Sequence, residues 1–254
     1  MLICWLARSS VCKAAKTLAC LITGQRFSLF NRMCACRRGP SQLIYYRYAV
    51  VFSSLNRSQP MHALIVVAHP DRDSFTHAVA RAVTNEIRSP HTFEIADLIA
   101  EGFDPRYGEA DLALFRNQSA PPADVLAEQK RIDRADALVL VYPVYWWSFP
   151  GVLKGWIDRV FTSGWAYGET PEGKINKKLG RLQVHLLGIG GANLRTYARR
   201  GYYAAMRTQI DEGIFDYVGA AVKTSELILL PDADSPETHL ETARQTGRRL
   251  FAEP

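Results

Sequence analysis

The first 60 residues contain no aspartate or glutamate, although they hold nine of the 31 lysines and arginines of this 254-residue chain. The part from residue 61 onward has 22 basic and 25 acidic residues, a net charge of −3, so the first 60, with +9, account for the overall +6. The folded part therefore lacks the basic surplus of a nucleic-acid-binding domain.

Cysteine is absent after residue 36, which excludes disulfides and thiol catalysis from the rest of the chain. This absence agrees with a reducing compartment, and we expect a cytoplasmic protein. The spacing of Cys34 and Cys36 matches no metal motif, no histidine precedes His62, and we expect no metal site. No stretch has the roughly 20 apolar residues of a membrane span, and Arg47 interrupts the most apolar segment near the start.

We expect two parts, a basic leader over 1–60 and one α/β domain over 61–254. The leader is either an organelle transit peptide or translated upstream sequence with Met61 as the true start. We favour the second explanation because Met61 falls directly on the first predicted strand. Removing the leader is then expected to leave folding intact.

The segment 137–161 organises the domain. Ala137 to Val141 is a short run rich in valine and leucine, which is typical of a parallel strand buried on both faces. Three aromatic residues follow on a loop, Tyr145, Trp146 and Trp147, and a helix pattern begins after Pro150. Because ligands bind beyond the carboxyl ends of such strands, this loop suits a large flat ring. The alternative is that these aromatic residues only cap the core.

Strands and helices alternate along the rest of the domain. We expect further strands at 63–68, 92–98 (at an edge), 182–189 and 223–230, and helices after Asp73 or Ser74, at 123–134, over 195–216 and at 237–251. Segments 99–120 and 162–180 are punctuated by glycine and proline, so they are predicted to be loops. The predicted fold class is α/β, a five-stranded doubly wound parallel sheet with helices on both faces.

The first strand-to-helix turn, 69–78, contains neither a Walker loop nor a GxGxxG motif. A helix start capped by Asp73 or Ser74 still offers free backbone N–H groups to a phosphate. On spacing alone this is a weak phosphate site, and an ordinary capped turn explains it equally well.

The aromatic segment resembles the flavin-dependent NAD(P)H:quinone oxidoreductase family of the DT-diaphorase type, which has a flavodoxin-like fold. The resemblance covers 61–251, and its core motif is Tyr142, Pro143, Trp146, Trp147, Pro150, Leu153, Lys154, Gly155 and Trp156. It implies that the backbone and side chains of Pro143, Val144, Tyr145, Trp146 and Trp147 line the flavin ring.

Other matches extend the implied site. His69, Ser74 and Phe75 match the family's first turn and would hold the flavin phosphates, with Thr76 in place of the usual asparagine. Gln129, within Ala-Glu-Gln-Lys, would contact the flavin. Gly190 and Gly191 match a Gly-Gly pair whose preceding threonines are missing here. Trp147, Trp165 and Tyr167 would face the substrate.

The family has a tyrosine and a histidine in the loop after Gly-Gly, but this loop contains no histidine. Tyr197 is the nearest match for the tyrosine, and Arg200 stands near the histidine's place. An arginine can hold negative charge but cannot donate its proton at neutral pH. We therefore expect Tyr197 and Arg200 to act electrostatically. The alternative is that Arg195, Arg199 and Arg200 form a solvated basic face.

By resemblance, the chain is expected to reduce quinones or similar acceptors by two-electron hydride transfer in a ping-pong reaction. FAD is the expected cofactor and FMN the alternative; NADH or NADPH is the donor. A homodimer is expected, because the family completes its substrate slot from the partner subunit. Two other functions stay open: an ancillary regulatory subunit of a potassium-efflux transporter, and a flavodoxin-type electron carrier.

Overall fold

A parallel sheet of five strands forms the centre of the domain. The computed structural model describes residues 59–232 and 235–251; the expectations for the leader therefore fall outside the described residues, apart from its last two positions. The strand order is β2-β1-β3-β6-β7, with all neighbours parallel. The strands are β1 (His62–Val67), β2 (Thr92–Asp97), β3 (Ala137–Pro143), β6 (Gln183–Gly190) and β7 (Ala221–Leu229). The predicted fold class is confirmed, and β2 lies at an edge as expected.

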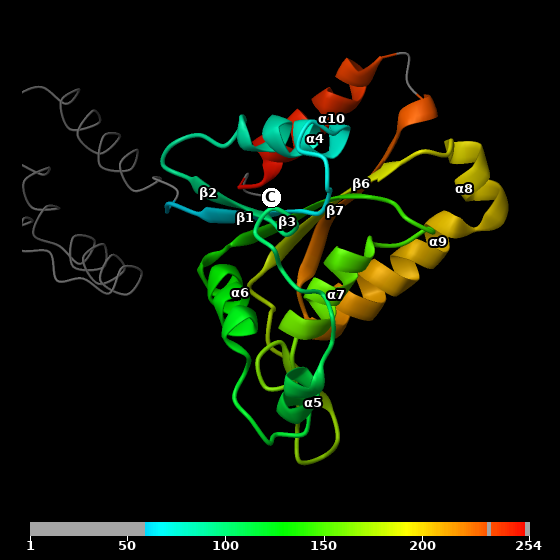
Figure 1. The fold of residues 1–254 in the computed structure, drawn as a ribbon. Helices are drawn as coiled ribbons and strands as arrows, with labels where there is room; N and C mark the ends of the chain where they lie inside the picture. Colours follow the sequence, from blue (N-terminus) through cyan, green and yellow to red (C-terminus); the bar gives the residue numbers. More distant parts are fainter. Residues whose placement is uncertain (1–58, 233–234, 252–254) are drawn as a thin grey trace, which may run out of the picture. The chain divides into compact units, whose positions relative to one another are not determined.

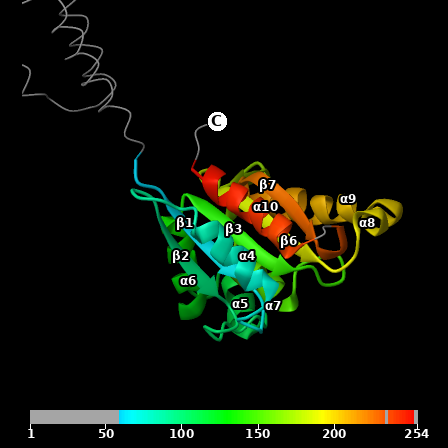
Figure 2. The same cartoon turned by 90° about the horizontal axis from the view of Figure 1, so that it is seen from above.

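Helices cover both faces of this sheet (Figures 1 and 2). On one face α4 (Phe75–Thr84) and α10 (Pro236–Arg249) lie side by side. The other face carries α6 (Ala123–Arg134), α7 (Gly151–Val160), α8 (Leu194–Arg200), α9 (Tyr202–Arg207) and the π-helix η2 (Thr208–Asp216). Two separate cores result, because alternate residues of each strand point to opposite faces. In the described part of the chain, no helix is both long enough and apolar enough to cross a membrane.

Two segments predicted to be loops contain regular structure. The segment after β2 includes the helix α5 (Glu109–Phe115), and the segment after α7 includes a small antiparallel hairpin, β4 (Tyr167–Glu169) with β5 (Ile175–Lys177). Both elements are short and mostly exposed. They have little apolar periodicity of their own, and periodicity was the basis of the prediction.

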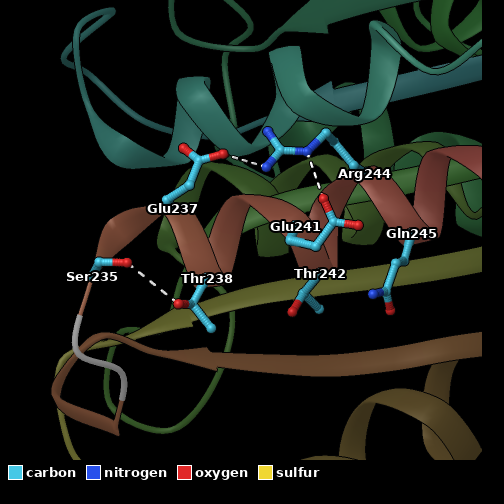
Figure 3. A pocket seen from close by; sticks show the side chains of 7 residues that line it. All are labelled: Ser235, Glu237, Thr238, Glu241, Thr242, Arg244 and Gln245. Atoms are coloured by element: carbon cyan, nitrogen blue, oxygen red, sulfur yellow. Dashed lines mark hydrogen bonds and ion pairs between the residues drawn. The ribbon is translucent and has the colours of Figure 1, made fainter.

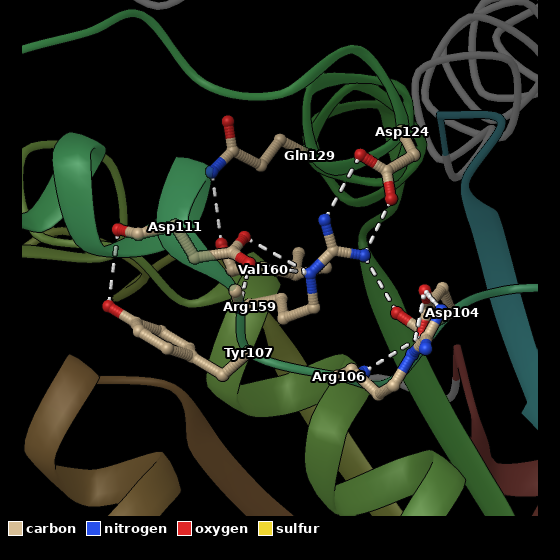
Figure 4. A network of polar contacts seen from close by, with 9 residues as sticks. Asp104, Arg106, Tyr107, Asp111, Asp124, Gln129, Arg159 and Val160 are labelled. Carbon is tan, nitrogen blue, oxygen red and sulfur yellow. Dashed lines mark hydrogen bonds and ion pairs between the residues drawn. The ribbon is translucent and has the colours of Figure 1, made fainter.

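A buried ion pair fastens the segment 99–122 to α7 (Figure 4). The Arg159 guanidinium donates to the Asp111 carboxylate of α5, with an Nε–Oδ1 distance of 3.0 Å, and both side chains are less than a tenth exposed. The Arg159 Nη1 donates to the Asp124 carboxylate at 2.6 Å and to the Asp104 carbonyl at 2.7 Å. Nearby, Gly155 leaves room for the chain, since an added Cβ would lie 2.2 Å from the Pro105 carbonyl oxygen. One arginine therefore joins the segment 99–122 and α6 to α7.

We predict that Arg159→Met lowers the free energy of unfolding by about 3–5 kcal/mol, because Asp111 would stay buried without a counter-charge. Arg106→Met is a matched control: Arg106 also pairs with an aspartate, Asp104, but is 85% exposed and contributes little. Urea unfolding of both variants tests this. Equal stability of Arg159→Met and wild type would contradict it.

Candidate functional site at the carboxyl edge of the sheet

The loops that follow β1, β3 and β6 leave the sheet at one edge. These strands are neighbours and run parallel, so their carboxyl ends lie side by side. The loops contain residues 68–74, 144–150 and 191–193. In a doubly wound sheet, this edge is where ligands bind. Nearly all the residues expected to contact a flavin belong to these loops or to the first residues beyond them.

The loop after β3 is a tight turn. The backbones of Tyr145 and Ser148 exchange two hydrogen bonds, of 3.1 and 3.0 Å. Between them, Trp146 and Trp147 have φ angles of 49° and 59°. This left-handed conformation costs a residue other than glycine about 1–2 kcal/mol. Such strain is typical of functional sites that the surrounding structure holds in place.

Packing against α8 and α9 holds the turn. The Trp147 indole stacks on Tyr202 with ring centroids 3.7 Å apart and an interplanar angle of 15°. It also meets Tyr197 edge to face at 5.1 Å. The Ser148 hydroxyl donates to Gln209 at 2.6 Å. Trp146, by contrast, is 93% exposed. The turn thus fixes one indole and presents the other to solvent.

The start of α4 is capped by Ser74, whose hydroxyl oxygen accepts from the His77 backbone N–H. Among residues 59–232 and 235–251, the backbone N–H groups of Phe75 and Thr76 have no acceptor. His69 Nδ1 lies 3.1 Å from both the backbone N–H and the carbonyl oxygen of Asp71, so this nitrogen is used within the loop and Nε2 is the ring atom left for a ligand. Several donors therefore meet here, the combination that a phosphate requires.

Thr76 itself is 2% exposed, so its backbone is better placed than its hydroxyl to reach a ligand. The loop also carries two acids, Asp71 and Asp73, whose charges would disfavour a phosphate. The Asp71 carboxylate, however, accepts from the Asp73 backbone N–H at 2.9 Å. One of the two negative charges is therefore partly satisfied within the loop.

The glycines at the end of β6 differ in their surroundings. A Cβ on Gly190 would lie 2.7 Å from the Tyr197 hydroxyl and equally close to Leu229, so only glycine fits. A Cβ on Gly191 would meet nothing within 4 Å among the described residues. The Gly191 backbone is thus open to a ligand. Free N–H donors, an aromatic turn and an open backbone at adjacent strand ends fit a flavin.

Within one chain Gln129 does not reach this edge, and its expected contact with the flavin stays a prediction. Its side chain is 2% exposed. Its amide donates to the Val160 carbonyl and to the Thr162 hydroxyl, both at 3.0 Å. Gln129 therefore joins α6 to the end of α7, and its two hydrogen bonds explain a polar residue on a buried helix face.

Trp165 and Tyr167 lie near the amino ends of the parallel strands, whereas Trp147 lies beyond their carboxyl ends. The Trp165 indole N–H lies 3.3 Å from the Asp133 carboxylate, near the end of α6, just before β3 begins. Tyr167 packs on Tyr217, shortly before β7 begins. Within one chain these residues cannot line the same slot as Trp147.

The two residues expected to act electrostatically differ in exposure. Tyr197 is 1% exposed beneath Trp147, and burial raises the pKa of its hydroxyl. It is therefore a neutral support of the turn. Arg200 ends α8, is exposed, and has no ion-pair partner within the described part of the chain. Gly201 follows it with a φ of 69° and lets the chain turn into α9.

Sequence reasoning missed the residues that support the site. His77 and Asp97 form a hydrogen-bond chain with Ser74, and Tyr202 carries the stack on Trp147. A histidine three residues after a capping serine and an aspartate ending a strand were available signals. Neither signal predicts that the two side chains meet, because the two residues are 20 positions apart in the sequence.

A shallow hollow of about 570 Å³ lies on the outer side of α10 (Figure 3). Arg244 bridges Glu237 and Glu241 across it. None of the predicted site residues lines this hollow. Its charged side chains are already paired, so we place the functional site at the carboxyl edge.

The fold and this edge define the class of protein: a flavodoxin-like α/β protein with its ligand site at the carboxyl ends of β1, β3 and β6. The family described as flavodoxin-like fold matches residues 61–250. NAD(P)H dehydrogenase (quinone) 1 of Cavia porcellus is 34% identical over 211 residues, which cover 74% of this chain and 75% of that protein.

Solved structures agree. The NAD(P)H:quinone oxidoreductase from Methanothermobacter marburgensis is 33% identical with a TM-score of 0.67, over 75% of this chain and 99% of that one. General stress protein 14 from Treponema denticola, solved in complex with FMN, is 25% identical with a TM-score of 0.52, over 74% and 95%. This chain belongs to the NAD(P)H:quinone oxidoreductase family with a flavodoxin-like fold.

We predict that Trp146→Gly raises the free energy of unfolding by about 0.5–1 kcal/mol, because glycine relieves the left-handed strain and only part of this gain is lost to its greater freedom when unfolded. Trp147→Gly relieves the same strain but loses two aromatic contacts, and should destabilise by about 1–3 kcal/mol. Thermal unfolding of both variants tests this. Two variants of equal stability would show that the stack on Tyr202 does not hold the turn.

Proposed function

We propose that this chain is a flavin-dependent NAD(P)H dehydrogenase that reduces quinones or similar acceptors by two-electron hydride transfer. The observation that carries the proposal is the strained aromatic turn, 145–148, fixed beside the donor-rich start of α4 and the open Gly191 backbone. Relatives named as quinone dehydrogenases support the substrate class. When bound, the flavin supplies the hydride chemistry, accepting from NADH or NADPH and delivering to the acceptor.

The protein's own residues would bind and orient the flavin. His69, Ser74 and the N–H groups of Phe75 and Thr76 would hold the flavin phosphates. Pro143, Val144, Tyr145, Trp146 and Trp147, with Gly190 and Gly191, would line the ring. One site serving donor and acceptor in turn implies ping-pong kinetics.

We propose FAD as the cofactor, with FMN as the alternative. The match at His69, Ser74 and Phe75 supports FAD, whereas a similar solved structure in complex with FMN supports the alternative. The proposal keeps a cytoplasmic location, as expected from the cysteine-free folded part. The relatives reported above are named as oxidoreductases or a stress protein, so they give no support to regulation of a potassium-efflux transporter.

The experiment that tests the function is purification of the full chain, followed by the absorption spectrum and mass of the bound flavin. Turnover of a quinone is then measured with NADH and with NADPH. Parallel double-reciprocal lines are expected for a ping-pong reaction. A protein that binds neither FAD nor FMN and oxidises no nicotinamide would contradict the proposal.

The proposal assigns Arg200 the task of holding negative charge that develops during hydride transfer, with Tyr197 supporting the adjacent turn. Arg200→Leu should slow reduction of the bound flavin by NAD(P)H about tenfold, the effect of losing one charged hydrogen bond. Arg199→Leu is the matched control, since Arg199 is the preceding, equally exposed arginine of α8. Equal stopped-flow rates in both variants and wild type would show that Arg200 only belongs to a solvated basic face and has no role in flavin reduction.

We further propose a homodimer. Trp165 and Tyr167 lie at the far edge from Trp147, so they can face the substrate only in the site of a second copy. Light scattering at micromolar concentration should give twice the mass of one chain. Trp165→Ala should then lower quinone turnover while leaving flavin affinity intact. An active monomer would contradict both expectations.

A further inference from the structure

His77 connects the phosphate-facing hydroxyl of Ser74 to a carboxylate. Its Nδ1 lies 3.1 Å from the Ser74 hydroxyl oxygen, and its Nε2 lies 3.1 Å from Asp97 Oδ2. Both His77 and Asp97 are largely enclosed, with side-chain exposures of 11% and 18%. Three residues from two separate segments therefore form one continuous hydrogen-bond chain that ends at the start of α4.

The direction of these hydrogen bonds depends on the charge of His77. A carboxylate only accepts, so Asp97 requires the proton on Nε2. In the neutral ring Nδ1 is then an acceptor, and the Ser74 hydroxyl must donate its hydrogen to it. When Nδ1 is protonated it donates to Ser74 instead, and the serine hydrogen becomes free for another acceptor. The protonated ring thus converts Ser74 into a donor for phosphate.

Asp97 is held in place for this role. Its Oδ1 accepts from the Ala100 backbone N–H at 3.1 Å, and its own N–H donates to Glu101 at 3.2 Å. Glu101 is in turn paired with Arg131 of α6 at 2.6 Å. Asp97 Oδ2 therefore stays directed at His77 while the neighbouring acid is neutralised by Arg131.

Other charged or titratable groups lie beside His77 or elsewhere around the start of α4. The His69 ring lies edge to face at a centroid distance of 6.4 Å. From α10, His239 packs on Phe75, next to the cap. The remaining groups are on the loop before α4 and on α4 itself: Asp71, Arg72, Asp73 and Arg81. Among the carboxylates of the described residues, Asp97 makes the direct hydrogen bond to His77.

We propose that His77, oriented by Asp97, is a positioning residue that sets Ser74 to donate to the flavin phosphate, and that flavin binding is coupled to proton uptake at His77. The inference rests on the proposed function, because the phosphate belongs to the flavin. The proton comes from solvent and adds to Nδ1. An anionic phosphate nearby favours the charged ring, and the charged ring favours the phosphate.

The sign of the pH dependence follows from this linkage. Around neutral pH the complex binds more protons than the free protein and free flavin together, so affinity is highest at acidic pH. It falls as the pH rises through the range in which histidine loses its proton. Riboflavin has no phosphate and should bind without this dependence. Replacing His77 by a residue that cannot titrate should remove it.

The experiment uses the full chain stripped of flavin, titrated with FAD or FMN, whichever binds the purified protein, and with riboflavin as the phosphate-free probe. Wild-type affinity should fall about tenfold between about pH 6 and about pH 8, the loss of one charged hydrogen bond. In His77→Gln the change should be no more than about twofold. The phosphate of FMN itself titrates near about pH 6, so the difference between wild type and variant is the quantity compared.

Calorimetry in two buffers of different ionisation enthalpy measures the proton directly. Uptake of up to about half a proton near neutral pH is expected for wild type, as a tenfold change in affinity implies, and none for His77→Gln. His62→Gln is the matched control, because His62 also lies near a carboxylate, 3.9 Å from Glu94, but begins β1 at the opposite edge. It should behave as wild type.

Parallel pH profiles for wild type and His77→Gln, or equal proton uptake in both, would overturn the inference while leaving the proposed function intact. Absence of flavin binding by wild type would overturn both. If His77→Gln does not fold, Ser74→Ala takes its place. At about pH 6 the Ser74→Ala variant should bind flavin as weakly as wild type does at about pH 8. If its flavin affinity changed with pH as much as that of wild type, the proposal would be contradicted.

Discussion

The burial of β3 along its whole length is the constraint on which the other features depend. All seven of its residues are buried, so the backbone groups bond to β1 and β6, and the side chains are apolar apart from the Tyr142 hydroxyl. Helices on both faces are the consequence. Polar and strained groups are excluded until the strand ends at Pro143, and the candidate site begins there.

The aromatic turn illustrates how this edge is stabilised from outside the sheet. Two consecutive tryptophans with positive φ would not persist in an isolated loop. Here the stack of Trp147 on Tyr202 and the hydrogen bond from Ser148 to Gln209 hold them. A chain segment about 60 residues downstream therefore sets the shape of a loop whose sequence alone already suggested a ring-binding surface.

Two networks of ion pairs, around Arg159 and Arg131, likewise hold separate segments of the domain together. Arg159 joins α7 to α5 and α6 through carboxylates that would be costly to bury alone. Arg131 neutralises Glu101, which leaves Asp97 to orient His77. In both cases an arginine on a helix fixes an acid contributed by the irregular segment after β2, so this segment is part of the support of the site.

The sequence by itself determined the elements that depend on local burial. The helix 123–134 was predicted at its observed bounds, the five strands were located to within about two residues, and Ser74 was among the two expected caps. Apolar period and capping residues act within a few positions along the chain, so they can be recognised without coordinates. The residues of the three edge loops were identified in the same way, with help from the family resemblance.

Only the tertiary structure decided which distant side chains meet. Gln129 lay on a plausible face of its helix, but that face packs on the end of α7. Trp165 was assigned to the substrate slot, but it lies at the other edge of the sheet. The meeting of His77 with Asp97 and of Trp147 with Tyr202 likewise depends on how packed layers bring separate segments together. Periodicity identifies a buried face, but the partner of that face is set by the packing of the whole domain.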